Sequence, residues 1–206
     1  MQAAEYEYPD AQARWNDDYV WKAVARELTR LTPPSKRVFE LGCGNGVSAA
    51  RMKMLGFSVT AVDPSTGGVS AATAAYPGIA FEVGEVDDPL SERFGQFPVV
   101  VSIEVLEHCY SPKRFAQCAL ELLEPGGHLI ATTPYHGYVK NLAIALAGKM
   151  DDHFGALWEG GHIKFFSMRT LRALLEGAGF ENVRIDRVGR IGPLAKSMVV
   201  TARKPR

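Results

Sequence analysis

The sequence predicts an α/β protein with a doubly wound, mostly parallel sheet, and three observations lead to this fold class. A glycine-rich turn at residues 42–46 follows a short apolar segment and precedes a helical stretch, the order found at a nucleotide-binding corner. Apolar segments of strand length then alternate with helical stretches over residues 57–133, as βαβ units require. The segment 99–103 is almost purely apolar, as a strand buried on both faces would be.

Each element follows from local patterns. Apolar residues at helical spacing mark residues 15–31, and Pro33-Pro34 ends that helix. Gly56 ends the helix that follows the glycine turn. We expect six main helices, at residues 15–31, 47–55, 65–75, 112–124, 139–150 and 168–177. We expect seven strands, at residues 38–41, 57–62, 79–83, 99–103, 128–133, 183–188 and 197–202.

Length and composition indicate one ordinary globular domain over residues 1–206, with 47% hydrophobic and 22% charged residues. Lys+Arg and Asp+Glu both number 23, so no basic field is available to attract nucleic acid. The three cysteines lack metal-ligand spacing, as expected of a reduced, cytoplasmic protein. Residues 1–10 have no apolar core, and we therefore expect no signal peptide. No apolar run reaches the roughly 18 residues of a membrane span.

The glycine turn distinguishes between two classes of cofactor. A dinucleotide site needs a small residue at its third conserved position, but that position, counted from Gly42, is Val47. Glu40 also ends the preceding strand, where its charge would oppose a pyrophosphate but suit an ammonium or sulfonium group. The residues E-L-G-C-G-N-G at 40–46 resemble the first motif of the class I S-adenosylmethionine (SAM) dependent methyltransferases.

A second resemblance to that family is independent of the first. Residues 105–108 read V-L-E-H, and residues 123–127 read L-E-P-G-G; both are similar to later motifs of the same methyltransferases. The resemblance covers residues 36–134 and implies a Rossmann-like, seven-stranded sheet of order 3-2-1-4-5-7-6 whose last hairpin is antiparallel. It also implies that residues 1–34 form a helical cover, with Tyr6, Tyr8, Arg14 and Trp15 as candidate lid residues. The alternative is a helix that only covers the sheet.

The resemblance implies a binding site for SAM and for its product S-adenosylhomocysteine (SAH). Asp63 would accept hydrogen bonds from both ribose hydroxyls, which suits a fixed carboxylate; the alternative is a helix cap. Glu85 would meet the adenine amino group, a role that Asp87 could share. The candidate cofactor-binding residues are Glu40, Gly42, Cys43, Gly44, Asn45, Gly46, Asp63, Pro64, Glu85, Val86 and Glu104.

Methyl transfer to a hydroxyl group needs a base or a metal to take up the proton. The candidate catalytic bases are His108, His136 and His162, all near the expected carboxyl ends of strands. The pattern E-x-x-E-H, formed by Glu104, Glu107 and His108, resembles the ubiquinone-biosynthesis O-methyltransferases, in which these positions are associated with a divalent cation. We expect no metal, and keep this trio as the alternative.

The connection at residues 135–161 is far longer than usual and is expected to form a substrate lid. Its predicted helix has one apolar face: Val139, Leu142, Ala143, Leu146, Ala147 and Met150. The alternatives are an ordinary core helix or a patch that makes peripheral contact with a membrane.

Together these features predict a SAM-dependent methyltransferase that O-methylates a small, apolar or aromatic hydroxylated molecule, as a monomer or homodimer. The alternatives are N- or C-methylation and binding of SAM without catalysis. Val47 argues against an NAD-dependent oxidoreductase, and the absence of a basic extension argues against a tRNA or protein substrate.

Overall fold

The structure, a computed structural model, describes residues 18–158 and 160–206. Its centre is a seven-stranded sheet of order β3-β2-β1-β4-β5-β7-β6, which confirms the predicted topology. Strands β1 to β5 are parallel, whereas β7 is antiparallel to both β5 and β6. The strands are β1 Arg37–Leu41, β2 Ser58–Asp63, β3 Ala80–Val83, β4 Phe97–Ile103, β5 Leu123–Pro134, β6 Glu181–Val188 and β7 Ser197–Arg203.

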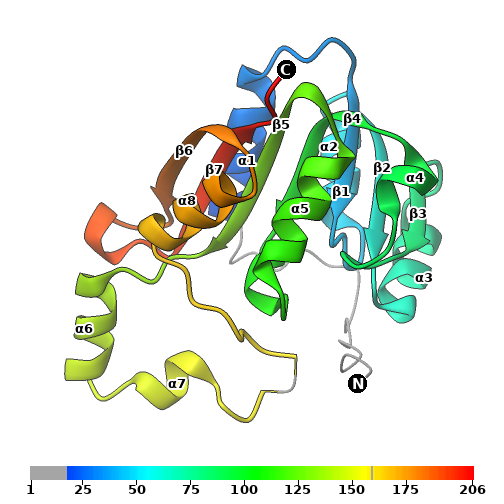
Figure 1. The fold of residues 1–206 in the computed structure, drawn as a ribbon. Coiled ribbons are helices and arrows are strands. Elements are labelled where there is room, and N and C mark those ends of the chain that lie inside the picture. Colours follow the sequence, from blue (N-terminus) through cyan, green and yellow to red (C-terminus); the bar gives the residue numbers. More distant parts are fainter. Residues whose placement is uncertain (1–17, 159) are drawn as a thin grey trace.

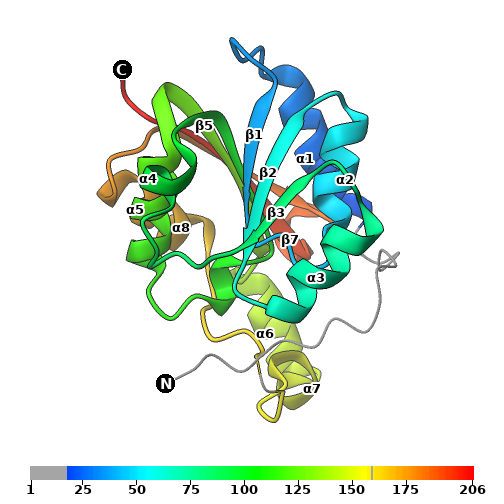
Figure 2. The same ribbon diagram turned by 90° about the vertical axis from the view of Figure 1, so that its right-hand side faces the viewer.

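Helices cover both faces of the sheet (Figures 1 and 2). One layer contains α1 Asp18–Arg30, α2 Val47–Met54 and α3 Thr66–Ala75, and the other contains α4 Leu90–Phe94, α5 Pro112–Leu122 and α8 Met168–Gly177. Two short 3₁₀ helices are η2 Leu106–His108 and η3 Gly192–Leu194. Each layer buries its own apolar cluster against the sheet: Phe39 and Phe115 belong to one cluster, and Val38 and Met52 to the other. Successive residues of β1 therefore supply opposite cores, as the period of a strand requires.

Two further helices, α6 Tyr138–Leu146 and α7 Met150–Phe154, form the segment between β5 and α8. They project from the edge of the sheet where the parallel strands end (Figure 1). Tyr135 and Phe166 form an isolated bridge across the two ends of this segment. The predicted lid therefore leaves the body at the edge where ligands bind in such sheets.

The structure corrects the expected boundaries in three places. The short helix α4 was missed, because five residues are too few to show a helical period. The predicted helix at 139–150 is two helices, separated at Gly148, whose φ of 65° is left-handed. Strand β5 begins at Leu123, which pairs with Phe97, so the proline and glycines at 125–127 lie within the strand and not in a turn; a register shift beside them accommodates the irregularity.

The predicted lid residues Tyr6, Tyr8, Arg14 and Trp15 lie outside the described residues. Over the described ranges, every helix is too short or too polar to cross a lipid bilayer.

Candidate active site

The glycine corner is built on backbone hydrogen bonds between β1 and β2. The N–H groups of Gly42 and Cys43 both donate to the carbonyl oxygen of Val62, at 2.9 and 3.0 Å. A Cβ on Gly42, whose φ is 83°, would lie 2.4 Å from a methyl carbon of Val105. Gly46, with φ of 82°, would bring a Cβ within 2.8 Å of Ala72 and Phe81. Both positions therefore require glycine for backbone conformation and for space.

Asp63 ends β2 beside this corner and is 5% exposed. Its Oδ2 accepts the N–H of Gly44 at 2.7 Å, and its Oδ1 accepts the N–H of Ser65 at 2.9 Å. Burial raises the pKa of Asp63, and these two hydrogen bonds oppose that effect. Because a carboxylate oxygen has two lone pairs, each oxygen retains one for a hydroxyl group. The cap of α3 is Ser65, whose hydroxyl accepts the N–H of Gly68; the alternative role of Asp63 as that cap is wrong.

Glu40 lies fully buried beneath the glycine corner. Burial raises its pKa to about 8. By geometry, neither carboxylate oxygen has a hydrogen-bond partner among the described residues. An unsatisfied buried carboxyl group is costly, so Glu40 is suited to meet a cation such as an ammonium group. The neighbouring Cys43 is also buried, which raises its thiol pKa and keeps it uncharged.

The remaining cofactor candidates lie along the same edge. Pro64 and Glu85 are exposed, whereas Asn45 and Val86 are half-buried. The N–H of Glu85 donates to Asp88 Oδ2 at 3.0 Å, and the Glu85 side chain is exposed. Asp87, the alternative, lies 3.7 Å from the Arg114 guanidinium.

Glu107, His108 and His162 come together after β4. The Glu107 carboxylate is fully buried; its Oε2 accepts the Thr133 hydroxyl at 3.0 Å, and its Oε1 lies 3.9 Å from His162 Nε2. The rings of His108 and His162 meet edge to face, 4.9 Å apart. Burial and the Glu104 carboxylate raise the pKa of Glu107, whereas burial and His108 lower the pKa of His162 to about 4. His162 is therefore a neutral imidazole at pH 7.

His108 has a defined tautomer. Its Nδ1 lies 2.8 Å from the carbonyl oxygen of Gly160. A carbonyl can only accept, so Nδ1 carries a proton, and in the neutral imidazole the lone pair then lies on Nε2. Nε2 is therefore the nitrogen that could act as a general base.

The third histidine, His136, lies in a separate aromatic cluster. Its ring stacks on Phe154 at 5.8 Å and meets Phe165 at 4.9 Å, and His153 lies 5.6 Å away. It is 8% exposed, and burial and Lys140 lower its pKa to about 4. His136 therefore joins α7 to the end of β5 as a neutral ring.

Donor atoms of Glu107, His108 and His162 lie within 4.8 Å of one another and could hold a metal ion. The structure thus groups His162, and not Glu104, with the other two predicted ligands. The Glu104 carboxylate instead accepts the Ser197 hydroxyl at 3.4 Å.

Sequence reasoning missed three polar residues that support the site: Thr132, Thr133 and Ser197. Thr132 accepts the N–H of Glu104 through its hydroxyl and its carbonyl, at 3.0 and 3.2 Å. A signal was present for the threonines, because two polar residues end an otherwise apolar strand at the edge where ligands bind. Ser197 gives no such signal, because it begins an antiparallel strand.

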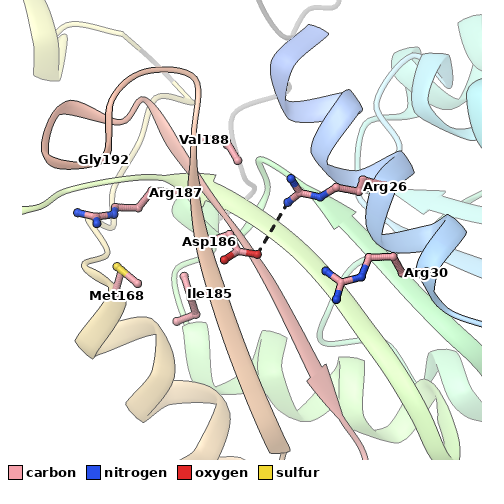
Figure 3. Close-up of a pocket in the computed structure, with 8 residues that line it drawn as sticks. All are labelled: Arg26, Arg30, Met168, Ile185, Asp186, Arg187, Val188 and Gly192. Atoms are coloured by element: carbon pink, nitrogen blue, oxygen red, sulfur yellow. Dashed lines mark ion pairs between the residues drawn. The ribbon is translucent and has the colours of Figure 1, made fainter.

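A hollow of about 540 Å³ lies elsewhere, beside the edge strand β6. Figure 3 shows its lining side chains on both sides of that strand, with Asp186 directed toward Arg26, which lies 3.8 Å away. The hollow is lined by Arg26, Arg30, Met168, Ile185, Asp186, Arg187, Val188 and Gly192. This hollow lies beside an edge strand and is lined by none of the groups described above. We therefore place the site at the glycine corner.

Comparison with known proteins agrees with this geometry. Residues 13–185 match the family described as "Methyltransferase domain". The chain belongs to this methyltransferase family. The predicted family is confirmed, and so is its Rossmann-like fold.

Similar methyltransferases come from several bacteria. A ubiquinone biosynthesis O-methyltransferase of Caulobacter sp. (strain K31) is 38% identical over 68% of this chain and 58% of its own length. One of Dinoroseobacter shibae is 30% identical over 90% of this chain and 78% of its own. The chain thus spans less than two thirds of the first of these relatives.

A solved SAM-dependent methyltransferase of Mesorhizobium loti has the same fold. It superposes with a TM-score of 0.70, at 20% identity, over 92% of this chain and all of its own. Membership of the methyltransferase family supports SAM as the cofactor, as the glycine corner predicts.

Proposed function

We propose that this methyltransferase transfers a methyl group from SAM to a hydroxyl oxygen of a small, apolar or aromatic molecule. The observation that carries the proposal is the contact of His108 Nδ1 with the Gly160 carbonyl oxygen, which makes Nε2 the basic nitrogen of the neutral imidazole. A hydroxyl nucleophile needs such a base. Similarity to ubiquinone biosynthesis O-methyltransferases supports the same acceptor class.

When bound, SAM supplies an electrophilic methyl group and leaves as SAH. The protein's residues align the acceptor and exclude water. His108 Nε2 takes the hydroxyl proton as the oxygen–carbon bond forms, and the Gly160 carbonyl stabilises the resulting imidazolium through Nδ1–H. His136, Phe154 and Phe165 supply apolar walls nearby.

A divalent cation is the second candidate for activating the hydroxyl. Glu107 Oε1 is buried and has no hydrogen-bond partner among the described residues, so the donor set of Glu107, His108 and His162 fits a metal. Two imidazoles and one carboxylate suit Zn²⁺ or Mn²⁺ better than Mg²⁺. When bound, the metal would lower the pKa of a coordinated hydroxyl group. Chelation therefore belongs in every assay of activity.

Amine or carbon acceptors are the alternative within the same class. A neutral amine already carries its nucleophilic lone pair, so it would leave the open Nε2 of His108 without a purpose. The proposed enzyme acts in the cytoplasm on a small molecule, as a monomer or homodimer, and does not bind nucleic acid.

Assay with methyl-labelled SAM tests the proposal. We expect label to enter at least one member of a panel of phenols, quinols and hydroxy acids, with matched anilines and thiols as the contrast. Each reaction is run with and without a chelator, and a boiled enzyme sample measures transfer that needs no protein.

The segment at 135–161 is proposed to be a lid over that acceptor. Helix α6 buries none of its residues; Leu142 and Leu146 are 43% and 80% exposed. This exposure contradicts the alternative of a core helix. The aromatic cluster of Phe154, Phe165 and His136 ties the segment to the strand ends.

Replacing Leu142 and Leu146 with serine should raise KM and leave the melting temperature within about 2 °C. The acceptor loses an apolar wall, whereas no core contact is lost. Steady-state kinetics and thermal melting measure the two effects. Met54→Ser, on the exposed face of α2 (84% exposed), is the matched control. An unchanged KM in the double variant would contradict the lid.

A further inference from the structure

Three polar side chains from distant parts of the chain form a line at the carboxyl edge of the sheet. The Tyr19 hydroxyl on α1 lies 3.2 Å from Ser197 Oγ, and Ser197 Oγ donates to Glu104 Oε2 at 3.4 Å. Ser197 is 2% exposed and is the first residue of β7. Ser197 has one hydroxyl proton and donates it to Glu104, so the Tyr19 hydroxyl is the donor to Ser197.

The backbone of Glu104 is held in an unusual conformation. Its φ of 53° is left-handed, which an L-residue with a side chain adopts only when its surroundings impose it. The two hydrogen bonds from its N–H to Thr132 supply that constraint. The side chain is thus aimed by the fold and does not follow from the regular geometry of β4.

The Tyr19 ring is also fixed in place. A Cβ on Gly189 would lie 2.7 Å from the ring, so this glycine lets the loop after β6 pack directly against it. The Lys196 ammonium lies 5.4 Å from the centre of the same ring, at cation–π distance. Tyr19, at the start of the line of hydrogen bonds, is therefore held in place, as Glu104 is at its end.

The line of hydrogen bonds ends beside the glycine corner. Val105, which follows Glu104, packs against Gly42 of the glycine corner. Burial and then the Glu104 charge raise the pKa of Glu107, whereas burial and Arg190 lower the pKa of Lys140 and the Glu104 charge opposes them, so Glu104 acts on neighbours across the site. Lys140 donates to the carbonyl oxygens of Tyr135 and Lys196 at 2.7 and 3.4 Å.

We propose that Tyr19 and Ser197 are positioning residues: their hydrogen bonds aim the Glu104 carboxylate at the sulfonium of SAM. The inference rests on the proposed function, because only SAM brings a positive sulfur to this edge. SAH lacks that charge and is otherwise the same ligand without the methyl group. The line of hydrogen bonds therefore controls the preference for SAM over SAH.

The test is calorimetric titration of SAM and SAH into wild-type protein and into Tyr19→Phe, Ser197→Ala and Glu104→Gln. Glu104→Gln should lose the preference for SAM. Tyr19→Phe and Ser197→Ala should each lower the affinity for SAM by about 3- to 10-fold, which corresponds to one hydrogen bond. Neither should change the affinity for SAH. Thr201→Val removes a hydroxyl from the same strand, where it accepts from Arg184, and should change neither affinity.

The double variant Ser197→Ala/Glu104→Gln should have the same affinities for SAM and for SAH as the single variant Glu104→Gln. The reason is that Ser197 affects SAM binding only through the Glu104 carboxylate. If Tyr19→Phe loses equal affinity for SAM and SAH, or loses none, the proposed positioning role of Tyr19 and Ser197 is wrong. The proposed function is not affected by that result. Tyr19→Phe keeps this test valid if Ser197→Ala fails to fold. A wild-type protein that binds neither ligand would overturn both.

Discussion

Replacing Asp63 with alanine is expected to weaken SAM binding by about 1.5–3 kcal/mol for each hydrogen bond lost to the charged carboxylate. Each oxygen of Asp63 holds one backbone N–H and retains one lone pair, so a ribose would find two acceptors at a fixed spacing. Calorimetry with SAM measures the loss, and NAD should not bind to the wild type.

The same substitution removes the acceptors of Gly44 and Ser65, so a lower melting temperature is expected as well. Ser102→Ala separates the two effects, because it removes a buried hydroxyl that donates to the carbonyl oxygen of Leu41 at 2.8 Å. If Asp63→Ala binds SAM as tightly as the wild type, the ribose assignment is wrong.

Replacing His108 with glutamine should lower kcat by about 10²- to 10⁴-fold, the usual worth of a general base, and leave SAM affinity nearly unchanged. The reason is the fixed tautomer, which presents Nε2 to the acceptor. His128→Gln is the matched control: this histidine lies in the middle of β5, opposite Arg203 of β7. If neither His108→Gln nor a chelator changes kcat, neither His108 nor a metal ion activates the acceptor.

The pH profile of kcat tests whether His136 or His162 is the base. Burial lowers the pKa of His136 and His162 to about 4, so both stay neutral, and able to accept a proton, down to about pH 5. If either is the base, kcat should be level from pH 8 to 5 and fall only as pH approaches 4. Loss of kcat at higher pH, in an enzyme that remains folded, excludes both.

The order of strands and helices could be predicted because its causes are local. Strand β1 and its turn are specified by adjacent residues, namely Val38, Phe39 and the glycines at 42–46. The apolar run at 99–103 likewise specifies a buried strand. Helix α4 escaped prediction because five residues carry no periodic signal, and the break at Gly148 because glycine within a helix pattern is common.

Candidate site residues could be predicted only where a single residue is marked by its position in a sequence motif. Asp63 follows an apolar strand and His108 follows a recognisable motif, so both could be proposed from their positions in the sequence. The line from Tyr19 to Ser197 to Glu104 does not, because its members are 178 and 93 residues apart and meet only when α1 and β7 pack at the sheet edge. Likewise, His162 meets Glu107 only in the folded chain, where the N–H groups of Ile163 and Lys164 donate to the carbonyl oxygen of Glu107.

The most direct test of the central claim is the position of the transferred methyl group. Wild-type enzyme is incubated with ¹³C-methyl SAM and the acceptor panel, and the products are examined by NMR. We predict a methoxy carbon on a phenolic or other hydroxyl oxygen, formed together with SAH and reduced at least 100-fold with His108→Gln. A methyl group on nitrogen or carbon, formed equally well by the His108 variant, would contradict the account.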